Sequence, residues 1–302
     1  MQSGLPIAII GAGAVGTTFA VALHQRGYRI AGVASRTPAS AERCASMVEC
    51  PHYSVDPVEV ARAADVIFIA TPDEAIQEVC RHITEEGGIK RGDIVVHFSG
   101  ALGSNILDSA KQKGGYVLAL HPIQSFPKGE VSVGNLVGSY FTLEGDPEAL
   151  RFGERVVGDL EGTAVSISSE TKPIYHAALC VACNYLVTLT DLAVKMLEAI
   201  GIKRQDALPM ILPLIKGTVH NLQRVSLPDA LTGPISRGDL RTLERHLGAI
   251  EKILPDYLDV YKKLGSLTAE VAKEKGSLDH DRYEELKRLF TKQDDRTPQQ
   301  NP

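Results

Sequence analysis

The chain contains the pattern Gly-x-Gly-x-x-Gly at residues 11–16, directly after the apolar run of residues 7–10. An apolar helix-forming segment follows, so the context indicates a strand, a tight turn and a helix, which is the order in which three such glycines bind a dinucleotide. Gly11 permits the turn, Gly13 lets the backbone approach a pyrophosphate, and Gly16 lets the helix pack closely on the strand. The predicted phosphate-binding turn, at a helix N-terminus, is Gly11, Ala12, Gly13, Ala14, Val15 and Gly16.

Composition and charge narrow the class of protein. The 302 residues are 44% hydrophobic and 23% charged, which is typical of a globular chain with room for two domains. A net charge of −5 and a pI near 6.0 argue against nucleic-acid binding. The N-terminus lacks the basic segment of a signal peptide, and charged residues are expected to interrupt every apolar run before it reaches membrane-spanning length. We therefore expect a soluble cytoplasmic protein with no membrane partner.

The five cysteines are scattered and odd in number, so they do not form a disulfide framework. Cys180 and Cys183 match Cys-x-x-Cys, but they lie in the middle of a helical pattern. A redox pair needs a helix N-terminus to lower a thiol pKa. We therefore expect both to pack in the core as small apolar residues, and no metal site is predicted.

Short apolar runs alternate with helical patterns through the first half of the chain. The expected strands are residues 7–10, 28–34, 65–70, 94–97, 116–120, 138–143 and 163–167. The expected helices between them are residues 14–26, 38–48, 73–84, 103–113 and 147–160. Because strands that alternate with helices are joined by right-handed crossovers, the sequence predicts an α/β domain with a mostly parallel sheet at residues 1–168.

The second half of the chain, residues 169–290, shows helical periodicity and no convincing strand, with several prolines that punctuate it. Residues 169–200 form a long and largely apolar segment that ends at Gly201, a plausible C-cap. A helix that is apolar nearly all round must be buried on most sides. We expect it to be the central helix of an all-helical second domain and part of a dimer interface. Residues 291–302 form a polar tail.

Ligands of such sheets bind beyond the carboxyl ends of the strands. The second strand ends there in Ser35, Arg36 and Thr37, without the Asp or Glu that usually holds the ribose of NAD. Arg36 offers a planar guanidinium that suits a 2′-phosphate, so NADP is predicted in preference to NAD. Arg36 as a solvated surface residue is the alternative. The third apolar strand ends in Ala70, Thr71 and Pro72, which complete the predicted cofactor site.

The next two strands end in His97 and His121, which share the same edge of the sheet. Either histidine is a candidate for proton transfer beside a nicotinamide, and the alternative is an ordinary hydrogen-bonded or solvent-facing histidine. Ser99 and Gly100 follow His97 in one loop. Their hydroxyl and amide groups are candidate donors to a substrate carboxylate.

Polar residues also interrupt the apolar character of the long helix. At about 100° per residue, Lys172, His176 and Asn184 fall on one broad face. A reductase needs a proton donor, and His or Lys can serve; His176 is the preferred candidate, with Asn184 orienting the substrate and Lys172 less favoured. In the loop before the helix from residue 240, Arg237 and Thr232 are candidate substrate contacts.

These motifs resemble proteins in which an α/β Rossmann domain is followed by a DUF2520 domain, a family associated with NADP-dependent oxidoreductases. The matching stretches are residues 11–16, 70–73, 97–100, 121–126, 175–178 with Asn184, and 232–234 with 237–239. The layout is more distantly similar to pyrroline-5-carboxylate reductase, ketopantoate reductase and the β-hydroxyacid dehydrogenases. The resemblance implies a helical, dimer-forming second domain like that of 6-phosphogluconate dehydrogenase, and hence a homodimer.

One departure limits what the resemblance implies about mechanism. β-Hydroxyacid dehydrogenases carry a catalytic Lys followed four residues later by Asn, whereas here Lys172 is followed at that spacing by His176. Lys172 therefore does not simply inherit the catalytic role.

The sequence thus predicts an NADP-dependent oxidoreductase that transfers hydride to or from a small carboxylate-bearing substrate. Two alternatives stay open. One is a non-catalytic NADP-binding sensor or scaffold protein, and the other is a reductase that uses a deazaflavin.

Overall fold

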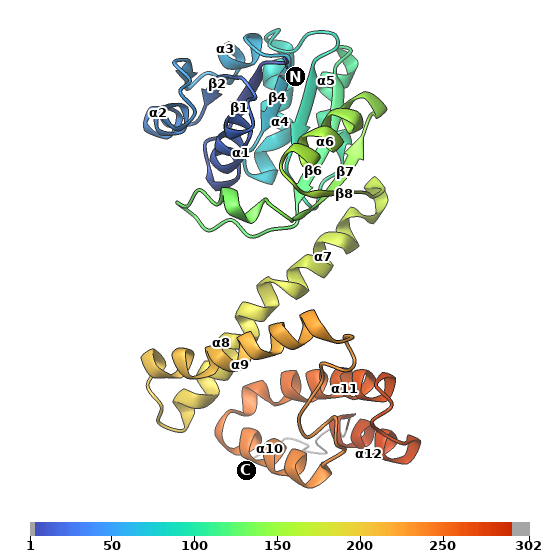
Figure 1. The fold of residues 1–302 in the computed structure, drawn as a ribbon. Helices are drawn as coiled ribbons and strands as arrows, with labels where there is room; N and C mark the ends of the chain where they lie inside the picture. Colours follow the sequence, from blue (N-terminus) through green and yellow to red (C-terminus); the bar gives the residue numbers. More distant parts are fainter. Residues whose placement is uncertain (1–3, 292–302) are drawn as a thin grey trace, which may run out of the picture. The chain divides into compact units, whose positions relative to one another are not determined.

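The structure, a computed structural model, describes residues 4–291 (Figure 1). The chain divides into two compact units, residues 1–185 and 186–302. The first unit holds the whole of the β-sheet, and the second is helical. Each unit is described by itself.

The first unit is built on one sheet with the strand order β3-β2-β1-β4-β5-β6-β7-β8. All neighbouring strands are parallel except β6 and β7, which are antiparallel. This confirms the predicted mostly parallel α/β sheet. The strands are β1 (Ile7–Ile10), β2 (Ile30–Ala34), β3 (Tyr53–Ser54), β4 (Val66–Ile69), β5 (Ile94–His97), β6 (Tyr116–Pro122), β7 (Tyr140–Gly145) and β8 (Thr163–Ser166).

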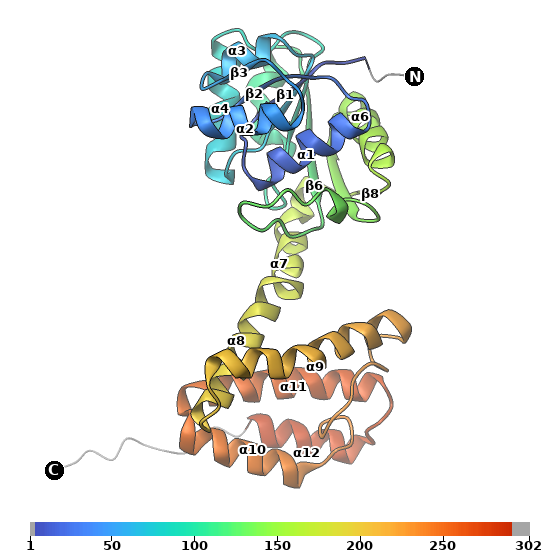
Figure 2. The same ribbon diagram turned by 60° about the vertical axis from the view of Figure 1, so that its left-hand side comes forward.

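Helices cover both faces of this sheet, because its central strands are apolar on both sides (Figures 1 and 2). Ile7 and Ile9 belong to a core with α1, α2 and α6, whereas Ala8 and Ile10 belong to a core with α3, α4 and α5. The helices of this unit are α1 (Ala14–Gln25), α2 (Pro38–Met47), α3 (Pro57–Arg62), α4 (Asp73–Glu85), α5 (Asp108–Gln112), α6 (Pro147–Asp159) and α7 (Lys172–Ala182), with short 3-10 turns η1 (Ser104–Leu107), η2 (Val133–Asn135) and η3 (Ser169–Thr171).

Every strand and helix predicted in the first half is present, with small shifts at the ends. β3 and α3 were not predicted, because both are too short to show a hydrophobic period. A local signal for α3 does exist: Asp56 accepts a hydrogen bond from the Val58 amide and Pro57 occupies the first turn.

The second unit contains α9 (Arg204–Arg224), α10 (Leu240–Ile253), the 3-10 turn η4 (Pro255–Tyr257), α11 (Leu258–Glu274) and α12 (His280–Thr291); α8 (Asn184–Ala199) begins at the boundary. Its core joins α10, α11 and α12 through buried side chains such as Leu243, Ala269 and Leu286. Figure 2 shows these three helices side by side. The prolines end fewer helices in this region than expected, because Pro209 and Pro213 lie inside α9.

Two expectations about the long apolar segment are wrong. No Asp, Glu, Lys or Arg lies between Lys172 and Asp191, and the helical stretch Ser169–Ala199 is long and apolar enough to cross a membrane by length and composition. Only 6% of its most apolar window is buried, so it is not the covered central helix that its composition implied. Cys180 is half-buried and Cys183 is exposed, so the prediction that both pack in the core is also wrong.

The strands end at Ser166, close to the boundary expected after residue 168. The compact units divide later, after Tyr185. The reason is that α7 packs side chains, among them Lys172 and Tyr175, against the residues that follow β5 and against β6 and β7. The first turns of the long helix therefore belong with the sheet.

Candidate functional site

The glycine turn after β1 has the geometry that its sequence predicts. Gly11 has a φ of +110°, and a Cβ there would lie 2.5 Å from the Ala70 carbonyl oxygen. A Cβ on Gly16 would lie 1.9 Å from the Gly11 carbonyl oxygen. Both positions exclude any side chain, the first by conformation and contact and the second because α1 crosses the turn so closely.

Gly13 differs from the other two glycines. It is the N-cap residue of α1, with an extended backbone that any residue can adopt. A Cβ there would meet no atom within 4 Å. The space that Gly13 keeps free is therefore not needed by the fold, and it opens into a cavity.

This cavity has a volume of about 800 Å³ and lies beyond the carboxyl ends of β1, β2 and β4. The size is within the range of cofactor sites. Of the residues predicted to bind the cofactor, Gly16 alone does not line it, since it lies behind the turn. The others do: Gly11, Ala12, Gly13, Ala14, Val15, Ser35, Arg36, Thr37, Ala70, Thr71 and Pro72.

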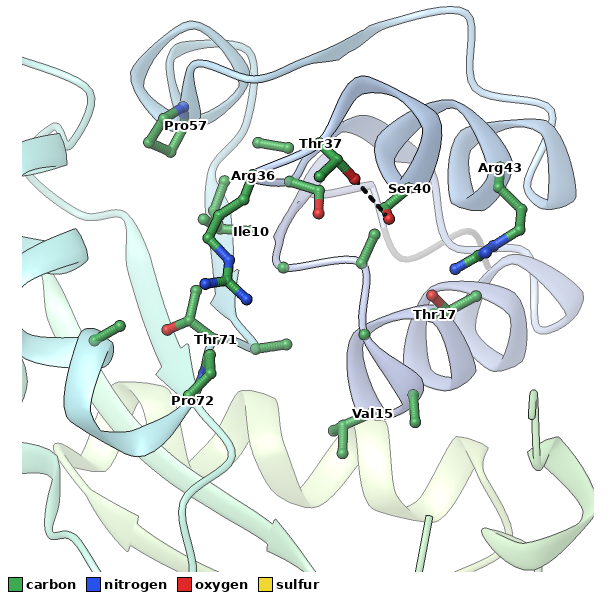
Figure 3. A pocket seen from close by; sticks show the side chains of 18 of the residues that line it. Ile10, Val15, Thr17, Arg36, Thr37, Ser40, Arg43, Pro57, Thr71 and Pro72 are labelled. Carbon is green, nitrogen blue, oxygen red and sulfur yellow. Dashed lines mark hydrogen bonds between the residues drawn. The ribbon is translucent and has the colours of Figure 1, made fainter. Parts of the chain in front are cut away.

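The part of the cavity lined by the residues after β2 and by α2, here called the cationic end, carries two arginines and several hydroxyl groups (Figure 3). Arg36 follows β2 and lies near Thr71, whereas Ser40 and Arg43 come from α2 and Arg43 lies near Thr17. The Thr37 hydroxyl donates a hydrogen bond of 2.8 Å to the Ser40 hydroxyl. Ser40 and Arg43 were not predicted as cofactor contacts; they lie three residues apart on one side of α2.

The cavity wall also carries a polar atom without a protein partner. Within residues 4–291, the Thr71 hydroxyl is the buried side-chain polar atom that lacks a hydrogen bond. A buried hydroxyl without a hydrogen bond destabilises the folded chain. A polar ligand in the cavity that formed this hydrogen bond would remove the destabilisation. Glycine turn, cationic end and orphaned hydroxyl together fit a phosphorylated dinucleotide.

A second group of polar residues follows the ends of β5 and β6, at the same edge of the sheet. His97 is completely buried, accepts a hydrogen bond from the Ser99 amide at Nδ1, and donates from Nε2 to the Gly103 carbonyl. Burial, with the Lys172 charge next in effect, lowers the pKa of His97 to about 3. His97 is therefore neutral, and both of its nitrogens hold the loop in shape.

The loop after β5 uses the Ser99 hydroxyl in a similar way. Ser99 donates to the Asp73 carboxylate at 2.7 Å and accepts from the amides of Ala101 and Leu102. Asp73 is the first residue of α4, and a cap was expected from its sequence position; the N-cap residue is Pro72. The hydroxyl that we predicted for substrate binding is occupied by this turn, whereas the buried Gly100 lies against His121 and His176.

Lys172, in the first turn of α7, is completely buried. Its ammonium group donates to the Ser99 carbonyl at 3.3 Å. Burial lowers the pKa of Lys172, and the opposing charges of Glu144 and Asp73 counteract this shift. Lys172 thus connects α7 to the loop after β5.

His121 lies on β6 directly opposite Thr142 of β7. Its Nδ1 is 2.7 Å from the Tyr175 hydroxyl, and the Thr142 hydroxyl donates to that same oxygen at 3.2 Å. The rings of His121 and His176 lie 6.2 Å apart, centroid to centroid. Burial, Lys172 and His176 lower the pKa of His121 to about 4, so its ring is neutral near pH 7.

The structure therefore brings His97, His121, Lys172 and His176 together at one sheet edge, within the first unit. Tyr175 and Thr142 complete this cluster and were missed as site residues. Tyr175 immediately precedes a histidine that the sequence did single out, but the pairing of Thr142 with His121 has no sequence signal. Of the other predicted residues, Asn184 is exposed at the start of α8, and Thr232 and Arg237 are exposed in the second unit; their roles stay predictions.

Comparison with known families assigns both halves of the chain. Residues 1–122 match a Rossmann-like domain, and residues 139–268 match DUF2520, a domain of unknown function. This confirms the resemblance drawn from the motifs. No curated protein sequence matches the chain.

Solved structures with the same fold are similar over nearly their whole length. A Bacteroides fragilis protein provisionally named an NADP oxidoreductase is 26% identical, with a TM-score of 0.71 over 89% of this chain and 98% of that one. A Thermotoga maritima protein is 27% identical, with a TM-score of 0.72 over 89% and 99%. An imine reductase from a Pseudomonas species shares the fold at 18% identity, with a TM-score of 0.60 over 95% and 98%. The matches support a dehydrogenase or reductase with a nicotinamide cofactor.

Proposed function

Because the chain joins a Rossmann-like domain to a DUF2520 domain, we propose that it is an NADP-dependent oxidoreductase acting on a small, carboxylate-bearing substrate. The observation that carries the proposal is the cavity beyond β1, β2 and β4. It combines a glycine turn for a pyrophosphate with a cationic end for a further phosphate.

The preference for NADP over NAD rests on the residues after β2. Arg36 and Arg43 both line the cavity, and the hydroxyls of Thr37 and Ser40 lie on the same wall. A ribose hydroxyl needs an acceptor such as a carboxylate, whereas a 2′-phosphate needs donors and positive charge. The set Arg36, Thr37, Ser40 and Arg43 consists of groups that donate hydrogen bonds, so it suits the 2′-phosphate.

The order of the strands supports the proposed reaction. NADP, when bound, supplies hydride transfer at its nicotinamide ring. β4, β5 and β6 are neighbours in the sheet, so the polar cluster around His121 lies along the same edge as the cavity. The Lys172 ammonium group places a positive charge at that edge, which favours a substrate with a negative charge. Proton transfer then falls to a side chain of this cluster.

The first experiment measures cofactor binding. NADPH fluorescence titration of the full chain should give saturable binding, and Arg36→Ala should weaken it by roughly 10- to 100-fold, the equivalent of one charge-assisted contact of about 1.5–3 kcal/mol. NADH affinity should change little. Arg29→Ala is the matched control, because Arg29 is exposed just before β2, at the opposite end of the strand.

A turnover assay then tests the reaction class. NADPH oxidation is followed with a panel of keto acids, cyclic imines that carry a carboxylate, and hydroxy acids in the reverse direction. Turnover of a panel member supports the proposal. NADPH binding without turnover of any member favours a sensor or scaffold protein, and binding of a deazaflavin that Arg36→Ala leaves intact favours the deazaflavin alternative.

We further propose that the chain forms a homodimer through α8 and α9. These helices expose large apolar side chains, among them Val187 at 69% and Leu214 at 72%. A large exposed apolar surface is typical of a protein–protein interface. In a two-fold dimer, the same apolar surface of a second copy would bury it.

The test of the dimer is the mass in solution. Light scattering should give the mass of a dimer, and Leu214→Glu should shift it toward a monomer, while Val137→Glu, an exposed residue of the first unit, should not. A monomer in wild type would contradict the proposal. Co-sedimentation with lipid vesicles would instead identify a membrane as the cover.

A further inference from the structure

The hydroxyl of Tyr175 is held between two neighbouring strands. His121 on β6 and Thr142 on β7 face each other in the sheet register, and Tyr175 reaches both from the first turns of α7. Its oxygen lies 2.7 Å from His121 Nδ1 and 3.2 Å from Thr142 Oγ1. Two side chains from the sheet thus fix the position of one phenolic oxygen.

A phenolic oxygen can accept two hydrogen bonds while its own O–H stays available. Thr142 is one donor. If His121 carries its proton on Nδ1, it is the second donor, and the Tyr175 O–H is left for another acceptor. We propose that Tyr175 is the residue that gives the proton to the substrate, and that His121 and Thr142 position it and stabilise the phenolate that it becomes. The inference rests on the proposed oxidoreductase function.

The charge states of the cluster are consistent with these roles. Tyr175 keeps its proton at neutral pH, since burial raises its pKa although the Thr142 contact lowers it. His121 faces Lys172 and His176, and these charges together with burial keep its ring neutral. A neutral imidazole has a single N–H, which the proposal assigns to Nδ1.

Two other basic residues of the cluster, His97 and Lys172, are less suited to deliver a proton. His97 is completely buried and uses both ring nitrogens for backbone contacts. Lys172 is also completely buried and donates to the Ser99 carbonyl. Tyr175 is less buried than these two residues.

The step balances as a reduction of a C=N or C=O bond. The carbon of the substrate receives the hydride from NADPH, which is oxidised to NADP⁺, and the nitrogen or oxygen receives the proton from Tyr175. The resulting phenolate accepts the hydrogen bonds of His121 and Thr142 and regains a proton from water. In the reverse direction the phenolate takes the proton from the amine or alcohol.

The first test needs neither substrate nor cofactor. Nitrogen-15 shifts of the His121 ring report which nitrogen carries the proton, and the expected result is Nδ1. In protein labelled with ¹³C at the tyrosine ring, Thr142→Val and His121→Phe should each raise the pKa of Tyr175, because each removes a donor to the phenolate. A proton on Nε2, or a lower Tyr175 pKa in His121→Phe, would overturn the proposed arrangement.

The second test uses turnover of the substrate found in the panel. Tyr175→Phe should lower kcat by roughly 10²- to 10⁴-fold, the usual range for loss of a general acid, with NADPH affinity unchanged. Tyr140→Phe is the matched control, since Tyr140 is an exposed tyrosine of β7. His121→Asn, which retains an N–H donor, should keep more activity than His121→Phe and shift the pH profile of kcat.

The outcomes separate the two proposals. If Tyr175→Phe retains wild-type kcat, the role of Tyr175 is wrong and the oxidoreductase function stands. If wild type turns over no panel member, the proposed function fails, and the catalytic role of Tyr175 fails with it.

Discussion

Gly13 and Gly16 lie three residues apart in the same turn, and they should respond to alanine in opposite ways. A Cβ on Gly16 would lie 1.9 Å from the Gly11 carbonyl oxygen, whereas ordinary contact begins near 3.4 Å, so roughly 1.5 Å of movement is needed in a close-packed turn. Overpacking of this kind costs about 1–3 kcal/mol or more. A Cβ on Gly13 meets nothing within 4 Å and its backbone suits alanine, so Gly13→Ala should be neutral or stabilise by up to about 1 kcal/mol.

The effects on cofactor binding should be the reverse: Gly13→Ala should weaken NADPH binding more directly than Gly16→Ala. The Gly13→Ala methyl group enters the space where we place the pyrophosphate, and loss of one backbone contact to phosphate of about 1.5–3 kcal/mol corresponds to roughly 10- to 100-fold weaker NADPH binding. Gly16→Ala should lower the melting temperature by several degrees, at about 2–4 °C for each kcal/mol. It should weaken NADPH binding only to the extent that the added methyl group displaces the glycine turn.

The assay pairs thermal unfolding with NADPH titration on the same preparations. Gly158→Ala is the control, because Gly158 lies on α6, lines no part of the cavity and also has open space around its Cβ position. Wild-type NADPH affinity in Gly13→Ala would refute the placement of the pyrophosphate. An unchanged melting temperature in Gly16→Ala would refute the packing argument.

Three further outcomes follow from single side chains. Thr71→Val should raise the free energy of unfolding by about 1 kcal/mol, since the lost hydroxyl has no protein partner, while NADPH titration should show weaker binding. His97 has a pKa of about 3 in the folded chain against 6.5 unfolded, so the unfolded state binds more protons between these values and stability falls as the pH falls. Urea unfolding should show about 2 kcal/mol less stability at pH 5 than at pH 7 from this residue, and His97→Gln should lack that part of the pH dependence; an equal slope in the variant would contradict the neutral buried ring. Ser99→Ala should destabilise by about 1–3 kcal/mol, because it leaves the Asp73 carboxylate and two loop amides without their partner, and calorimetry that shows no loss would exclude this role.

The strands, the helices and the cofactor cavity could be predicted because their signals are local. The run of residues 7–10 and the glycines after it are contiguous, and Arg36 follows the next long strand directly. Ser40 and Arg43 were missed because they lie on α2, beyond the residues that directly follow the strand. β3 and α3 were missed because two and six residues are too few to show a period.

The polar cluster was only partly predictable. Because ligands bind beyond the carboxyl ends of parallel strands, the sequence placed His97 and His121 at one edge. It could not show that both ring nitrogens of His97 bond to the loop backbone, or that the Ser99 hydroxyl donates to Asp73. The apolar helix shows the opposite failure. Its composition predicted a buried helix, whereas the described chain leaves it exposed, because composition does not say which residues of the chain pack against it.

The sequence by itself determined the α/β order, the glycine turn and the cationic end of the cavity, because each depends on residues that are neighbours along the chain. Only the tertiary structure decided which polar side chains meet. His121 and Tyr175 are 54 residues apart, and Thr142 and Tyr175 are 33 apart. They come into contact because β6 and β7 pair in one register and α7 packs its first turns against them. No local pattern encodes that packing, since it depends on the summed burial of the whole first unit.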